Sequence, residues 1–346
     1  MLPNEVAQAH RASRVRVADR VRRQSLALWG QMDLAQLDRS WDMIGPRIGA
    51  VVAAGQVEAA RQTAAYMRRV DRITPARFDD VELAVESFGG VTLAGREVVP
   101  EAFNAVVETK TFIGRGVPPE QAFMRGAMSL AVMAGTFVAD MGRQADMTLA
   151  TAKGYTSYVR ILSGGACSRC AILAGKEEYS KPFLRHPQCR CQSWPVAGDK
   201  AEPVPEGMSD SPTEFFDGLS EAEQDRRFTK AGAEAIRNGA DPGKVVNARR
   251  GYFGSKPANV PVRRLRPVQI GVRPDGSPLN VFATAEGTTA RGAFARQERA
   301  ASAAAAREGR YRRTTMLRLM PEQIVSMAGG NRERLVELLT RYGYLY

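Results

Sequence analysis

Apolar residues recur at helical spacing over most of the first 150 residues. Within residues 5–69, Val17, Val21 and Leu28 form one apolar stripe, and a second stripe follows from Val52 onward. Residues three, four and seven positions apart share one face of an α-helix. The pattern therefore predicts two or three helices in this stretch.

Start and stop signals predict three further helices. Thr74-Pro75 supplies a hydroxyl cap and a proline at the first helical position, and Gly89-Gly90 ends that helix. A second helix is predicted from Pro100 to Gly114 and the longest from Pro118 to about Gln144. The longest one is rich in Ala, Gly and Met, so neighbouring helices can approach it closely and we expect it to pack in the core.

The second half of the chain mixes strand, linker and helix signals. Residues 155–162 are rich in β-branched and aromatic side chains and predict a strand, whereas residues 195–212 read as a linker. Ser220, with a glutamate three residues later, has the spacing of a capping box and predicts another helix. Residues 321–327 and 331–342 predict two short helices at the end of the chain.

Composition narrows the class of protein. The 346 residues are 44% hydrophobic and 25% charged, which are ordinary globular values, and the length favours two or three domains. The net charge of +12 favours a polyanionic or acidic partner over a small neutral substrate. Residues 1–23 are too polar for a secretory signal, and the apolar run 126–139 is shorter than the roughly 20 residues that span a bilayer. We therefore expect no membrane segment.

Basic residues are concentrated in two places. The first predicted helix carries a basic face that we expect to be solvated, made of Arg11, Arg14, Arg16, Arg20, Arg22 and Arg23. From Arg249 to Arg318 there are fifteen Arg or Lys and only four acidic residues, an excess that nearly equals the whole net charge. Because this segment also holds five prolines, we expect an extended basic arm with little core. Its candidate contacts to nucleic acid are Arg249, Arg250, Arg263, Arg264, Arg266, Arg312 and Arg313.

The four cysteines of the chain lie close together in sequence, with a histidine among them. The candidate ligands are Cys167, Cys170, His186, Cys189 and Cys191. Such clustering favours a metal site over a disulfide framework. Zinc takes four such ligands tetrahedrally, so one candidate is surplus, and the sequence does not choose between Cys189, Cys191 and His186.

A structural zinc site is the expected use of these residues. A catalytic zinc keeps one position open for water, whereas here five candidates compete for four positions. A Ser-His or Cys-His catalytic device needs a free histidine. His10 lies in the basic first helix without a nucleophile motif, and His186 is a candidate ligand. We therefore expect no enzymatic activity.

At these residues the sequence resembles a known family. The strings CSRCAILAGK (167–176) and RHPQCRC (185–191), followed by WP, are similar to the Mu F-like minor head proteins of tailed bacteriophages. FVADMGR (137–143), FTKAGAEAIRNGAD (228–241), VVNARRG (245–251) and the end of the chain resemble the minor capsid proteins of actinobacterial siphophages. The resemblance covers roughly residues 100–346.

The resemblance implies a structural virion protein for head morphogenesis. It implies a few copies inside the capsid at the portal vertex, made in the host cytoplasm, which aid capsid assembly and DNA packaging or ejection. The portal protein is the implied partner, with the major capsid protein and packaged DNA as further contacts and with no membrane or small-molecule substrate. Because related proteins are often labelled capsid maturation proteases, a protease is one alternative, and a nonspecific nucleic-acid-binding protein is the other.

The sequence thus predicts a mainly α protein with five parts. We expect a helical domain (1–150), a small zinc-bound Mu F-like module with short β-strands (151–200) and a short helical segment (201–256). An extended basic arm (257–318) then leads to a C-terminal helical tail (319–346).

Overall fold

The chain is mainly helical, as its hydrophobic pattern predicts. Packing divides it into two compact units, one of residues 1–166 and 174–210, the other of residues 167–173 and 211–346. The computed structural model describes residues 2–74, 76–78, 81–162, 165–175, 177–179 (backbone), 183, 189, 191–196, 211–252, 267–288, 294–296 and 317–345.

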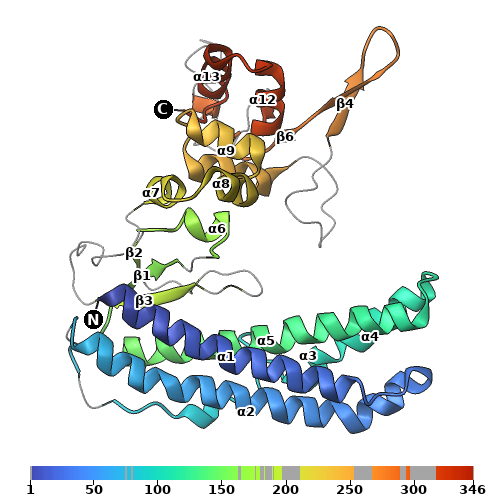
Figure 1. Cartoon of the computed structure of the whole chain (residues 1–346), viewed down its shortest axis with the longest axis vertical. Coiled ribbons are helices and arrows are strands. Elements are labelled where there is room, and N and C mark those ends of the chain that lie inside the picture. The colour runs from blue at the N-terminus through green and yellow to red at the C-terminus, as the bar shows by residue number, and fades with distance from the viewer. Residues whose placement is uncertain are drawn as a thin grey trace, which may run out of the picture. The chain divides into compact units, whose positions relative to one another are not determined.

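Three long helices form the framework of the first unit and lie side by side (Figure 1). They are α1 (Pro3–Trp29), α2 (Leu37–Asp71) and α5 (Pro119–Ala152). The prediction for residues 5–69 is confirmed as two helices, which are joined by a 3-10 turn, η1 (Leu34–Gln36).

The bundle has an apolar core where the three helices meet. Trp29 of α1, Ile48 of α2 and Leu130 of α5 are all at most 1% exposed. Burying each such side chain contributes about 1.5–3 kcal/mol. The small residues of α5 let a neighbouring helix approach closely, as expected. A Cβ on Gly126 would lie only 2.0 Å from the Thr109 hydroxyl of helix α4.

Helix α5 is longer than its sequence pattern indicates. It begins at Pro119 as predicted but ends at Ala152 rather than near Gln144, because buried Ala145, Leu149 and Ala150 continue its apolar face. Among the described residues it is the one helix long and apolar enough to cross a membrane by length and composition. It packs against α1, α2 and α4, and a core helix has the same composition.

The predicted helix between Thr74 and Gly89 is wrong. The described residues of that stretch contain only a 3-10 turn, η2 (Val85–Phe88). The amides of Arg77 and Phe78 donate to the carbonyl of Lys153 at 3.1 Å, so tertiary contacts replace helical ones. The helix predicted from Pro100 instead begins two residues earlier and divides into α3 (Val98–Ala102) and α4 (Asn104–Gly114).

A three-stranded antiparallel sheet completes the first unit. Its order is β2 (Glu177–Tyr179), β1 (Ser157–Ile161) and β3 (Gln192–Val196), so β1 confirms the predicted strand. Pro195 was expected to begin a linker, but it lies in β3 opposite Tyr158. Because β3 is an edge strand, the missing N–H of a proline is tolerated there. Residues 197–210 of the expected linker lie outside the described residues.

The second unit is built from short helices around its own apolar core. Phe216 and Phe228 pack edge to face with centroids 5.2 Å apart, and Leu338 and Tyr344 are fully buried. The Ser220 hydroxyl accepts from the Glu223 amide, as the capping signal predicts. The helices are α6 (Ser168–Ala171), α7 (Pro212–Asp217), α8 (Glu221–Phe228), α9 (Lys230–Arg237), α10 (Pro242–Ala248), α12 (Pro321–Ala328) and α13 (Arg332–Arg341).

The described part of the expected basic arm contains paired strands. A hairpin joins β4 (Val268–Val272) to β5 (Pro278–Val281), and β6 (Ala283–Thr284) pairs with β7 (Arg318–Leu319). Residues 267–280 of the hairpin are not buried, as expected, whereas Val281, Ala283 and Phe294 are buried. The expectation of little core is therefore wrong only for the described residues from 281 onward. Tertiary packing onto α12 and α13 outweighs the polar, proline-rich composition of the segment.

Candidate metal centre

Three thiols meet in one buried group. Cys170 of α6, Cys189 and Cys191 place their sulfur atoms within 4.8 Å of one another. Two sulfurs bound tetrahedrally to one zinc at about 2.3 Å lie about 3.8 Å apart, so small movements would let the group share an ion. A set of thiolates suits zinc, copper(I) or iron, so the group could hold a soft metal ion.

The group resolves part of the ambiguity in the sequence. Cys189 and Cys191 both belong to it, rather than one or the other. Cys167, at the N-cap of α6, is partly buried and is not a member of the group of three. The fifth candidate, His186, lies outside the described residues.

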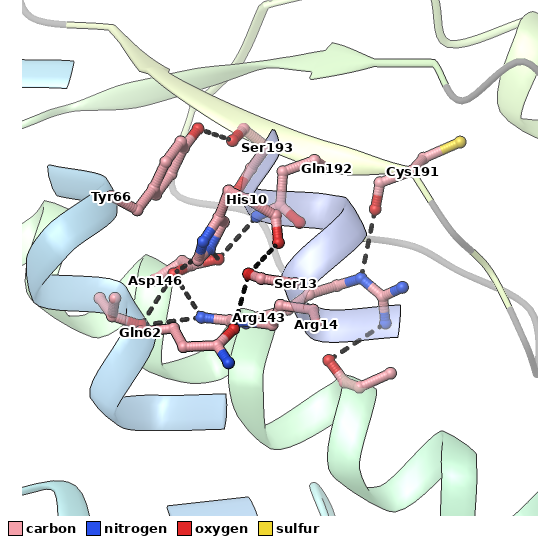
Figure 2. Close-up of polar contacts among 12 residues, drawn as sticks. His10, Ser13, Arg14, Gln62, Tyr66, Arg143, Asp146, Cys191, Gln192 and Ser193 are labelled. Atoms are coloured by element: carbon pink, nitrogen blue, oxygen red, sulfur yellow. Dashed lines mark hydrogen bonds and ion pairs between the residues drawn. The ribbon is translucent and has the colours of Figure 1, made fainter. Parts of the chain in front are cut away.

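Strand β3, which directly follows Cys189 and Cys191, is hydrogen-bonded to the helical bundle. The Tyr66 hydroxyl of α2 donates to the Ser193 carbonyl at 2.8 Å, and the Gln192 side chain donates to Asp146 of α5 at 2.6 Å. Trp194 is fully buried and forms a T-shaped pair with the Tyr66 ring. The backbone that carries Cys191 is therefore placed by both α2 and α5 (Figure 2).

Arg143 of α5 contacts the cysteine segment itself. Its Nε donates to the Cys191 carbonyl at 3.3 Å, and its Nη2 donates to the Cys189 carbonyl. Nη1 pairs with Asp140 on the same helix at 3.4 Å. Arg143 is buried, so these bonds are shielded from water, and one guanidinium fixes the spacing of two candidate ligands.

Asp146 is the centre of a buried polar network (Figure 2). Its carboxylate accepts from Arg14 at 2.8 Å, from the Thr63 hydroxyl at 2.8 Å, from the His10 ring and from Gln192. Burial alone would raise the pKa of Asp146, but the charges of Arg14 and His10 and the bonds from His10 and Thr63 lower it to about 2. The carboxylate is therefore ionised at neutral pH.

His10 is a structural member of this network. Its ring stacks on Tyr66 with centroids 4.1 Å apart, and Nε2 contacts both Asp146 oxygens at 3.1 and 3.2 Å. Burial lowers its pKa and outweighs the opposing effect of Asp146. The nearby Ser13 hydroxyl lies 2.8 Å from the His10 carbonyl oxygen and 2.8 Å from Gln62 Oε1 and is not bonded to the ring, so these described contacts contain no Ser-His pair.

Comparisons with known protein families, with curated proteins and with solved structures found no match. The site must therefore be interpreted from its own geometry.

The candidate nucleic-acid contacts have different environments. Arg249 leaves only 9% of its side chain exposed and pairs with Glu322, and burial lowers its pKa to about 10. This placement disfavours a direct phosphate contact by Arg249, whereas Arg250 is exposed. Arg263, Arg264, Arg266, Arg312 and Arg313 lie outside the described residues.

Sequence reasoning missed the charged residues that organise the bundle beside β3. Arg14 was expected on a solvated face, but it is 6% exposed and bound to Asp146. Asp146 and Arg143 lie among the Ala, Met and Leu positions of α5. A charged residue on the apolar face of a helix is the signal that could have identified them, since such groups are rarely buried without partners.

Proposed function

We propose that this chain is a structural minor head protein of a tailed phage, held in shape by a bound metal ion rather than acting as an enzyme. One observation carries the proposal: three of the four cysteines of the Mu F-like strings form one buried group of thiols. A buried group of thiols suits a closed structural site better than a catalytic one.

Zinc is the metal that we propose for this group. It prefers tetrahedral sulfur and nitrogen ligands and needs no redox partner. With Cys170, Cys189 and Cys191 in place, Cys167 or His186 would supply the fourth ligand. Structural zinc contributes about 10–16 kcal/mol in small zinc peptides, so a bound ion would strongly stabilise the fold around these cysteines.

The location that we propose is the capsid interior at the portal vertex, with the portal protein as partner. The resemblance supports this location, and the net charge of +12 is compatible with nearby packaged DNA. Contact with DNA would be nonspecific and would weaken as salt rises, because phosphate contacts release counterions. Exposed arginines such as Arg250 would take part.

Analysis of purified virions tests this function. We expect the chain among the virion proteins, and density for it at the portal vertex in a reconstruction calculated without imposed symmetry. A matched comparison is the lysate of infected cells, in which the chain should also occur. Abundance in the lysate combined with absence from the virions would contradict a capsid role.

A further inference from the structure

A small pocket beside β3 is walled by arginines. It lies between α1, α5 and the cysteine segment and has a volume of about 40 Å³. Its lining contains no carboxylate and consists of Arg11, Arg14, Val15, Ala18, Arg22, Ala139, Arg143, Cys189 and Gln192. Four of these nine residues are arginines, so the lining itself carries only positive charges.

Carboxylates outside the pocket neutralise only part of this charge. Arg14 pairs with Asp146, Arg22 with Asp19 and Arg143 with Asp140. Arg11 donates to the neutral amide of Gln8. Even after this pairing the wall keeps a positive excess next to the pocket.

The Arg14 guanidinium also has unpaired hydrogen-bond donors. Only its Nη2 is bonded, to Asp146 and Thr63, whereas its buried Nε and Nη1 have no hydrogen-bond partner. The residue is 94% buried, being 6% exposed, and it lines the pocket. Buried unpaired donors on a charged group are costly, so Arg14 retains unused hydrogen-bonding capacity beside the pocket.

Two glycines of α5 leave room for Arg14 and Arg22 to lie against the helix. A Cβ on Gly142 would lie 2.2 Å from Arg14 Nη1, and a Cβ on Gly135 would lie 2.1 Å from Arg22 Nε. Any larger residue would push these guanidinium groups aside. The arginine wall is therefore built into the packing of α1 on α5 rather than being a chance gathering of surface charge.

We propose that this pocket binds a small oxyanion of the phosphate or sulfate class, either free or as the terminal group of a phosphomonoester. A water molecule occupies about 10–15 Å³ of cavity volume, so the pocket of about 40 Å³ has room for about three waters or one small anion. Guanidinium groups match the oxygens of phosphate in charge and in bidentate geometry. The site is independent of the proposed capsid function.

Thermal unfolding of the full-length protein in inorganic phosphate, at an ionic strength held constant with sodium chloride, tests the proposal. Phosphate should raise the unfolding midpoint of the wild type in a saturable manner. The double variant Arg11→Gln, Arg22→Gln removes two partly exposed wall residues and should weaken the apparent phosphate affinity about tenfold or more. Arg16→Gln, on an exposed position of the same helix outside the pocket, should retain the wild-type response.

Two further arms make the outcome decisive. Adenosine monophosphate replaces inorganic phosphate in one arm: an equal effect assigns the site to phosphomonoesters, and an effect of inorganic phosphate alone assigns it to free oxyanions. In the other arm, Ala139→Leu fills the pocket and should abolish the response. The proposal is overturned if phosphate acts no better than chloride, or if it stabilises the wall variants as much as the wild type.

Discussion

The two ends of the long helical bundle are stabilised by different means. Where the end of α1 meets the beginnings of α2 and α5, the contacts are apolar and involve Trp29, Trp41 and Leu130. At the opposite end the same three helices meet through His10, Arg14, Thr63 and Asp146, which are all buried.

The apolar end sets the general packing of the bundle, whereas the polar end fixes the positions of particular residues. Apolar packing is tolerant of exchange between side chains of similar size, so it sets the bundle without fixing one detailed arrangement. A buried carboxylate with four donors accepts only one arrangement of its partners. One of those donors, Gln192, belongs to β3, so the polar end also places the strand that carries Cys191.

Removing the Asp146 carboxylate should cause the largest loss of unfolding free energy. Asp146→Ala leaves the buried Arg14 charge unpaired, and breaking a buried pair in this way costs about 3–5 kcal/mol of unfolding free energy, measured by urea denaturation. Glu58→Ala breaks the Arg20 pair, whose side chains are 45% and 43% exposed, and should cost less than about 1 kcal/mol. Equal losses in the two variants would contradict the role given to Asp146.

A cavity at the apolar end should destabilise the fold without touching the cysteines. Leu130→Ala removes a fully buried side chain and should cost about 2–5 kcal/mol in the same urea experiment. Because Leu130 does not belong to the network around β3, the metal affinity of the folded protein should stay at the wild-type value. A metal affinity that falls with Leu130→Ala would mean that the two ends are not separable.

Removing the Arg143 guanidinium should lower the metal affinity of the folded protein. Arg143→Met keeps much of the side-chain volume but removes the donors to the Cys189 and Cys191 carbonyls. Loss of such an outer contact lowers metal affinity about 10–100-fold, measured by competition with a chromogenic chelator. Arg125→Met, at an exposed position of the same helix, is the matched control, and an equal affinity in both variants would refute the role of Arg143.

His10 should produce the smallest effect, visible as a pH dependence. Its pKa in the folded protein lies below 6.5, so the unfolded chain takes up the proton first and stability falls as the pH drops below about 6.5. Asp146, with a pKa of about 2, keeps its charge throughout this range. His10→Gln should therefore lose less stability than the wild type between pH 7 and pH 5.5 in urea denaturation. Parallel pH profiles would contradict this assignment.

The two ends also differ in how far the sequence predicts them. The apolar stripe through Val17, Val21 and Leu28 predicts α1 correctly, because burial of one helix face follows from spacing alone. The burial of Arg14 does not follow from spacing. Its partner Asp146 is 132 positions away in the sequence, and only the fold brings the two together.

The candidate site also combines features that the sequence predicts with features that depend on tertiary contacts. The clustering of cysteines predicts a metal-binding group, and the group of three forms as a buried set. The strand character of Pro195 could not be predicted, because it depends on pairing with Tyr158 at the sheet edge. The failed helix after Thr74 has a similar cause, since contacts with Lys153 override a good local start signal.

The most direct measurement is the metal content of the purified full-length protein, together with titration of its four cysteines. A closed structural site predicts about one equivalent of zinc per chain, thiols that resist titration until the protein is unfolded, and loss of the metal in Cys189→Ser. Less than about half an equivalent of any metal, with all four thiols titrating freely in the folded protein, would contradict a structural metal centre.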